Sequence, residues 1–270
     1  MQWRPLFTGA LIALALSTAA CTHTRSGTPT HFPTADPPQS VTAAPAPTTR
    51  EQLCDVQSWP RPIPDVVGRL FNQVNGDGAL WCWQNVRGMT TDGRDPSRDK
   101  TYRVTAVSPP AGTPLGRFDA VSVELAEVDP SAPPASRPCD WVTTTEAAGI
   151  MGGPVSAKPD GDEAGSVDIG CYYDQTPDVG EGVETDLRLP GAFPVDAAAQ
   201  FALATTSTNV TNEEGMGLKA VCVHEPTTTP PSTTLVVLLS GGRLFRVTEG
   251  YASCDKVKRF AQLAISRIDA

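Results

Sequence analysis

Six cysteines after residue 50 constrain the fold of this chain more than any other feature. They are Cys54, Cys82, Cys139, Cys171, Cys222 and Cys254. An even set of cysteines in an exported protein is typical of a disulfide framework. Six cysteines allow many connectivities, and the sequence alone does not choose among them. The nearly equal spacing within consecutive pairs nevertheless suggests sequential pairing: Cys54–Cys82, Cys139–Cys171 and Cys222–Cys254.

The first 20 residues have the layout of a secretory signal peptide. Arg4 forms a short basic region, residues 6–16 are apolar, and residues 17–20 are small. The apolar run is too short to span a bilayer as a helix. Cys21 follows directly and resembles the cysteine of a bacterial lipobox, whose thiol receives a diacylglyceryl group, although Thr18 stands where Leu is usual. We expect Cys21 to be lipidated and to anchor the protein at the extracytoplasmic face of the membrane; a secreted chain with one odd cysteine is the alternative.

Composition divides the rest of the chain into four parts. Residues 21–50, rich in Thr, Pro and Ala, predict a disordered tether. Residues 51–128 predict a small, mostly β domain, residues 129–138 a Pro-rich linker and residues 139–270 an α+β domain. The net charge of −9 comes entirely from the last part. Such an acidic surface argues against nucleic acid or anionic lipid headgroups as partners.

The order of predicted elements gives an α+β fold with largely antiparallel sheets packed by helices. In the N-terminal domain we expect one helix and three strands: a helix over 66–74 and strands over 80–83, 102–107 and 118–128. In the last of these, Val121, Val123 and Leu125 share one face. In the C-terminal domain we expect helices over 143–151, 195–205 and 254–268, and strands over 167–174, 183–189, 218–224, 234–240 and 243–249.

The helix over 254–268 has the clearest pattern. Val257, Phe260, Ala261 and Ala264 recur at the spacing of one apolar helix face. Cys254 falls on the same stripe and therefore points toward the sheet, where Cys222 is a reasonable partner. Gly241-Gly242 predicts a hairpin turn between the two preceding strands, and the threonines at 143–145 are candidate N-caps.

Residues 139–270 resemble a domain of unknown function found in many actinobacterial, especially mycobacterial, cell-envelope lipoproteins. The resemblance rests on the strings PCDWVTTTEAAGIMGGPVS, GCYYDQ, GLKAVCV, LLSGGRLFRVT and SCDKVKRFAQLAISRI. Extracellular sensor domains of some mycobacterial receptor kinases are similar in general plan. The resemblance implies an extracytoplasmic origin and a disulfide-stapled fold. The family has no established catalytic residues, so it implies none here.

Catalytic motifs are absent from the sequence. His224 is the one histidine of the predicted domains, and no Gly-x-Ser-x-Gly elbow accompanies it, because the string around Ser240 is a hairpin turn. We therefore expect no catalytic role for His224 or Ser240. No phosphate-binding glycine motif occurs, so we expect no nucleotide cofactor. No Cys-x-x-Cys or His-x-x-x-His spacing supports zinc.

An acidic run contains nine carboxylates and no Lys or Arg: Asp160, Asp162, Glu163, Asp168, Asp174, Asp178, Glu181, Glu184 and Asp186. A calcium loop would need an oxygen ligand at Ala164 and a glutamate at Cys171, so the EF-hand pattern fails. We expect a solvated acidic surface and no metal. A pair of carboxylates suited to glycoside hydrolysis stays open, because sequence does not give their separation.

Trp81 and Trp83 flank Cys82 and would share one face of a strand. They are candidates for stacking on a sugar or lipid, although a buried core pair is the favoured interpretation. The sequence as a whole favours a non-catalytic, membrane-anchored module that binds a ligand or protein partner of the cell envelope. The alternatives are an envelope-glycan hydrolase with an Asp/Glu pair and a carrier of an apolar lipid.

Overall fold

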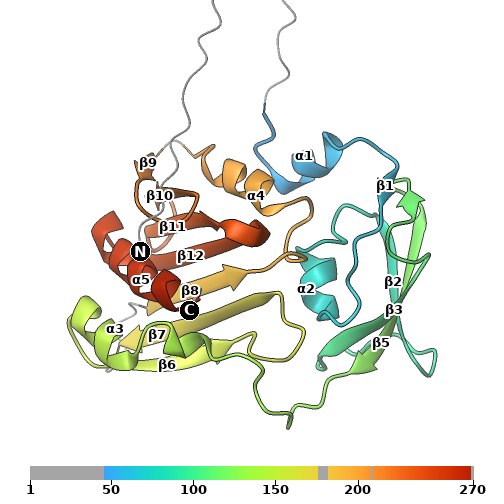
Figure 1. Cartoon of the computed structure of the whole chain (residues 1–270), viewed down its shortest axis with the longest axis horizontal. Helices are drawn as coiled ribbons and strands as arrows, with labels where there is room; N and C mark the ends of the chain where they lie inside the picture. Colours follow the sequence, from blue (N-terminus) through green and yellow to red (C-terminus); the bar gives the residue numbers. More distant parts are fainter. Residues whose placement is uncertain (1–45, 176–181, 208, 269–270) are drawn as a thin grey trace, which may run out of the picture. The chain divides into compact units, whose positions relative to one another are not determined.

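Two β-sheets organise the part of the chain that the computed structural model describes, residues 46–175, 182–207 and 209–268. The larger sheet has seven antiparallel strands in the order β6-β7-β8-β12-β11-β10-β9 (Figure 1). The smaller sheet has the order β2-β5-β3, with β2 and β5 parallel and β3 and β5 antiparallel. These sheets and the helices that pack on them confirm the predicted α+β class.

The described residues leave out part of the sequence predictions. The signal peptide, Cys21 and the tether as far as residue 45 lie outside them, as do Asp178 and Glu181. No helix among the described residues is long and apolar enough to cross a membrane.

The seven-stranded sheet is built from residues that follow residue 154 in the sequence. Its strands are β6 (Val155–Asp160), β7 (Asp168–Gln175), β8 (Gly182–Arg188), β9 (Val210–Glu213), β10 (Lys219–Glu225), β11 (Ser232–Leu239) and β12 (Arg243–Gly250). Five of them lie where strands were predicted. The two edge strands, β6 and β9, were not predicted, because they are short and polar and β6 contains Pro159. An edge strand buries little, so it lacks the apolar alternation that reveals an inner strand.

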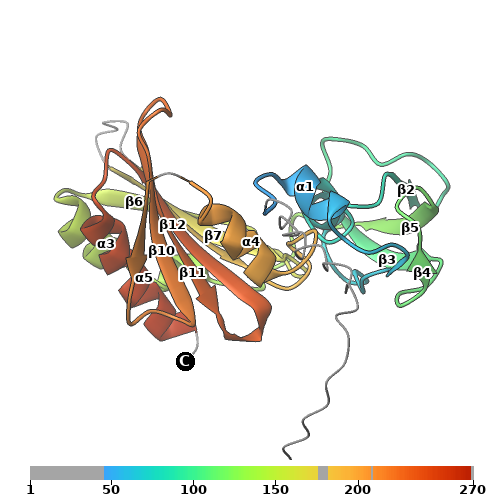
Figure 2. The same ribbon diagram turned by 90° about the horizontal axis from the view of Figure 1, so that it is seen from above.

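Helices cover both faces of this sheet. Helices α3 (Thr144–Met151) and α5 (Cys254–Ile268) lie on one face, and α4 (Ala197–Ala204) lies on the other (Figure 2). The apolar stripe of α5 is buried as predicted and packs with Phe245 and Val247 of β12. The predicted N-cap of α3 is Thr143, in a capping box with Glu146.

The N-terminal part contains a short helix α1 (Arg50–Asp55), a second helix α2 (Phe71–Gly76) and the strands β2 (Asn85–Thr90), β3 (Tyr102–Ser108) and β5 (Ala120–Glu127). Two further two-residue strands, β1 (Arg61–Pro62) and β4 (Pro114–Leu115), pair with each other. The predicted face of β5 is buried. Helix α1 and strand β2 were not predicted.

Two predictions for this part were wrong. Residues 80–83 form turns instead of a strand: the backbone N–H of Trp81 binds the carbonyl of Gly78, and that of Trp83 binds the carbonyl of Leu80. The helix expected over 66–74 begins only at Phe71, because Gly68 has a φ of 82°, which a right-handed helix cannot contain. In both places the apolar residues are buried without forming the regular helix or strand that their spacing predicted.

Three disulfides tie these elements together. They join Cys54 to Cys82, Cys139 to Cys171 and Cys222 to Cys254, with Cα–Cα distances of 5.3, 5.1 and 6.0 Å. These are the pairs that sequential pairing predicts. The second ties the 3-10 turn η1 (Pro138–Asp140) to β7, and the third ties α5 to β10. Each loop closure is expected to stabilise the fold by about 3 kcal/mol through the entropy of the unfolded chain.

The side chain of Gln73 on α2 connects the two parts of the chain. Its Oε1 accepts hydrogen bonds from the backbone N–H groups of Val167 and Asp168, at 2.7 and 3.3 Å, and its Nε2 donates to the carbonyl of Asp168 at 3.2 Å. Val167 and Ala192 also pack within the apolar core of the N-terminal part. The division into two domains at residues 129–138 stays a prediction.

Candidate functional site

The face of the large sheet under α4 carries a cluster of charged side chains. Along β8, Val183 and Leu187 point into the core beneath α5, so the alternating residues Glu184, Asp186 and Arg188 point to the opposite face. The register places Arg246 of β12 beside Asp186 and Asp168 of β7 beside Arg188. Opposite charges therefore meet across neighbouring strands. We call these five residues, Asp168, Glu184, Asp186, Arg188 and Arg246, the charged cluster.

Both arginines of the charged cluster already have partners. The Nε of Arg246 donates to Oδ2 of Asp186 at 2.7 Å, and its Nη2 contacts the same oxygen. The Nη2 of Arg188 donates to the carbonyl of Ala192 at 2.7 Å, while its Nε lies 3.3 Å from Oδ2 of Asp168. The side chains of Asp186 and Arg188 are only 6% and 7% exposed. The pairing of Asp186 with Arg246, and the hydrogen bond from Arg188 to the carbonyl of Ala192, lower the cost of burying these two charges.

One aspartate of the charged cluster has a strongly raised pKa. Burial raises the pKa of Asp168 to about 8, with a further contribution from the neighbouring carboxylate of Asp186. Oδ1 of Asp186 is buried and has no hydrogen-bond partner among the described residues. A carboxyl whose pKa is raised to about 8 is mostly protonated at neutral pH. Burial also raises the pKa of Glu184.

The charged cluster opens into a groove of about 620 Å³ between α4 and the sheet. The groove is lined by residues of β8, β10, β11, β12, α4 and the turn behind α4: Glu184, Arg188, Gln200, Leu203, Ala204, Thr206, Ser207, Val223, Glu225, Ser232, Thr234, Val236, Leu244, Arg246 and Thr248. This volume lies in the range of small-molecule sites. Phe201 and Ala197 hold α4 against the sheet through the apolar cluster beside the groove.

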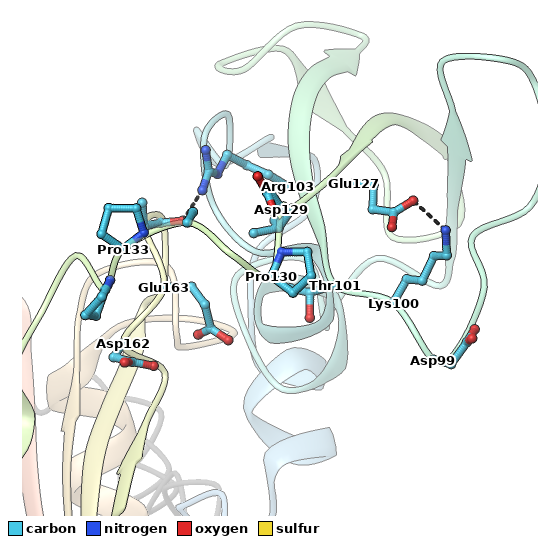
Figure 3. Close-up of a pocket in the computed structure, with 14 residues that line it drawn as sticks. Asp99, Lys100, Thr101, Arg103, Glu127, Asp129, Pro130, Pro133, Asp162 and Glu163 are labelled. Atoms are coloured by element: carbon cyan, nitrogen blue, oxygen red, sulfur yellow. Dashed lines mark hydrogen bonds and ion pairs between the residues drawn. The ribbon is translucent and has the colours of Figure 1, made fainter.

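A second pocket, of about 330 Å³, lies along the predicted linker. Figure 3 shows Asp162 and Glu163 on one side of it and Asp99 and Lys100 on the other. Lys100 pairs with Glu127 at 2.7 Å, and Arg103 donates to the carbonyl of Ala164 at 2.6 Å. Loop residues with exposed side chains form most of its wall. The groove under α4 is the better candidate, because its charged side chains are fixed on strands by burial and pairing.

The two tryptophans considered for ligand stacking do not share a surface. Trp83 is 4% exposed and packs edge-to-face on Trp59, with 5.3 Å between ring centroids, whereas Trp81 is 36% exposed. The prediction of a buried core pair is confirmed for Trp83 and wrong for Trp81, which is exposed. The two residues do not share a strand face, because the backbone N–H of each closes a turn and residues 80–83 form no strand.

His224 lies near the end of β10, and its Nδ1 is 3.0 Å from the hydroxyl oxygen of Thr233. Among the described residues, no serine, cysteine or carboxylate forms a hydrogen bond with its ring, and Ser240 lies in the hairpin turn η2 (Ser240–Gly242). Gly241 and Gly242 have φ values of 70° and 68°, which accounts for two glycines at this turn. No group of three or more His, Cys, Asp or Glu residues suited to a metal occurs in the described part of the chain.

Sequence reasoning found part of the charged cluster. Asp168, Glu184 and Asp186 belong to the acidic run, but that run was interpreted as a solvated surface, and for the buried Asp186 this was wrong. Arg188 and Arg246 were not singled out. The signal that reveals them is a charge at an alternate position of an otherwise apolar inner strand, which places it on the opposite face of the sheet.

Comparison with known families and with curated proteins finds no match to this chain. Among solved structures, the chain is similar to the extracellular domain of PknH from Mycobacterium tuberculosis, with 12% sequence identity and a TM-score of 0.27. The alignment covers 51% of this chain and 98% of that domain. A TM-score of this size carries no inference about this protein.

Proposed function

We propose that this protein is a lipid-anchored binding protein at the extracytoplasmic face of the cell membrane, and that it holds its ligand in the groove under α4 without changing it chemically. One observation supports the proposal above all. The groove has a volume in the range of small-molecule sites, and its charged side chains are fixed on rigid strands by burial and pairing. The lipobox-like Cys21 and the disulfides fit an envelope location.

The geometry of the aspartates argues against the hydrolase alternative. Carboxylates that cleave glycosides lie about 5–10 Å apart, so that a water or a sugar carbon fits between them. Asp186 is only 6% exposed, its Oδ2 is bound by Arg246, and neither Asp168 nor Asp186 is among the residues that line the groove. This pair of carboxyl groups therefore does not face a ligand in the groove. The lipid-carrier alternative needs a large apolar cavity, whereas two thirds of the residues that line this groove are polar or charged.

Native mass spectrometry of the protein purified from its own envelope tests the proposal. We expect a retained small molecule on the wild type and its loss when Thr234→Trp fills the groove. Thr211→Trp, on the exposed edge strand β9, is the matched control and should keep the molecule. Near-UV circular dichroism checks that both variants fold. A ligand retained equally by both variants would place the binding site elsewhere.

A further inference from the structure

Three exposed apolar side chains lie around helix α1. They belong to Val56, Trp81 and Phe118, which are 59%, 36% and 74% exposed. Val56 is the C-cap residue of α1, and Figure 1 shows this helix at the upper edge of the N-terminal part. A single exposed apolar side chain is common on proteins, whereas a group of them marks a binding surface. We call Val56, Trp81 and Phe118 the α1 patch.

Contacts with α1 hold the two aromatic members of the α1 patch close to the helix. Cζ of Arg50, in the first turn of α1, lies 5.9 Å from the ring centroid of Trp81. Phe118 follows Arg117, whose guanidinium forms an ion pair with Asp55 at the end of α1. Because α1 has six residues and is about 9 Å long, the three side chains share one region of the surface.

The charges around the α1 patch do not favour an anionic partner. Its two arginines, Arg50 and Arg117, are each paired with an aspartate. Glu51 and Asp119 add two exposed carboxylates to the same region. Binding to this surface must therefore come from the apolar side chains, and an uncharged or zwitterionic partner suits it better than an anionic one.

The position of α1 in the sequence brings the α1 patch close to the predicted membrane anchor. Residues 22–45 join Cys21 to the first described residues, which come just before α1. A flexible chain of about 25 residues has a root-mean-square end-to-end distance of about 30 Å. Such a tether keeps the surface near its attachment point at a millimolar effective concentration beside the membrane, so a weak apolar contact is enough for binding.

We propose that the α1 patch binds the surface of the lipid bilayer in which Cys21 is anchored. Tryptophan is enriched where membrane and water meet, and the side chains of Val56 and Phe118 offer apolar surface to the boundary of the acyl chains. The inference rests on the lipid anchor of the proposed function and adds an interaction surface outside the groove under α4. Binding of the patch would hold the N-terminal part against the membrane.

Quenching of tryptophan fluorescence by brominated lipid tests the proposal. The purified, lipidated protein is inserted by its anchor into vesicles of phosphatidylcholine, with or without bromine on the acyl chains. We expect the brominated lipid to quench Trp81 and the quenching to be lost in Trp81→Phe, which keeps an apolar ring but removes the reporter. Trp141→Phe is the matched control and should keep the quenching, because Trp141 packs on Phe245 in the C-terminal part.

A second pair of variants tests the contact itself. Phe118→Asp should remove most of the quenching of Trp81, because withdrawing one aromatic side chain from the bilayer lowers the ratio of bound to free patch by about 10-fold. Tyr251→Asp is the matched control and should leave the quenching unchanged. Tyr251 follows β12, is 67% exposed and has a φ of 57°, which aspartate adopts readily. Near-UV circular dichroism checks that each variant folds.

The possible failures differ from one another. Equal fluorescence in brominated and plain vesicles, or equal quenching of the wild type and Phe118→Asp, would overturn the proposal and leave the anchor and the groove in place. A dimer of Cys21→Ser in analytical ultracentrifugation that Phe118→Asp dissociates, without quenching of the wild type, would overturn it in favour of a second copy. A wild type that carries no lipid and does not float with the vesicles would refute the anchor of the proposed function, and this inference with it.

Discussion

Replacing Asp168 by asparagine should remove a pH dependence from the stability of the protein. Because the pKa of Asp168 is raised to about 8 from an ordinary value of 3.8, the folded protein keeps a proton that the unfolded chain releases. Its contribution to stability is therefore complete below pH 4 and is lost as the pH rises toward 8 and above. Asparagine resembles the protonated acid in shape but cannot ionise.

The size of the effect follows from burial. A shift of this size on a fully buried group corresponds to about 6 kcal/mol. The side chain of Asp168 is 38% exposed, so solvent screens the interaction, and we expect less than half of that value, about 2 kcal/mol, between pH 5 and pH 9. The lowered pKa of Glu146, about 2, acts in the opposite direction but below this range.

Urea unfolding at pH 5, 6, 7, 8 and 9, followed by tryptophan fluorescence with the disulfides intact, measures this difference. The free energy of unfolding of the wild type should fall with pH, and that of Asp168→Asn should fall less. The exposed loop residue Glu163 gives the control Glu163→Gln, which should follow the wild type. A wild type whose stability is flat or rises over this range, or an asparagine variant with the wild-type slope, would refute the raised pKa of Asp168.

Other consequences can be measured in the same way. Arg246→Met leaves the carboxylate of Asp186 buried without its cation and should lower the free energy of unfolding by about 3 kcal/mol. A loss below about 1 kcal/mol would contradict the pairing of these two residues. Thr143→Ala removes the N-cap of α3 and its bond with Glu146 and should cost about 1 kcal/mol by urea unfolding, with no change meaning that the cap contributes nothing. Radiolabelled fatty acid should enter the wild-type chain and be absent from Cys21→Ser, which is released to the medium; equal labelling of both would exclude the anchor.

Sequence predicted the elements whose pattern comes from burial on one face. Helix α5 matches its predicted bounds because its buried stripe repeats at the helical spacing, and the inner strands match within about two residues. The edge strand β9 and the turns at 80–83 were missed for opposite reasons. The first is too polar to show a pattern, and the second is apolar without being extended, because a disulfide and core packing fix its conformation.

The sequence revealed only some of the residues of the candidate site. Its carboxylates were noted, but the proton on Asp168 depends on burial and on the nearness of Asp186, which lies on another strand. The pairing of Asp186 with Arg246 depends on strand order, since β8 pairs with β12 across α4 and three other strands of the sequence. The spacing of residues in the sequence therefore does not predict that Asp186 and Arg246 are in contact.

The carboxamide of Gln73 has a practical consequence for anyone who shortens this protein. Its Oε1 accepts hydrogen bonds from the backbone N–H groups of Val167 and Asp168, as a backbone carbonyl of a neighbouring strand would. An expression fragment starting at residue 139 would expose these groups to water next to the carboxyl of Asp168, whose pKa is raised. Its acid–base behaviour, and the ligand preference of the groove, would then differ from those of the whole chain even though every groove residue is present. Assays on such a fragment would therefore not report the properties of the whole chain.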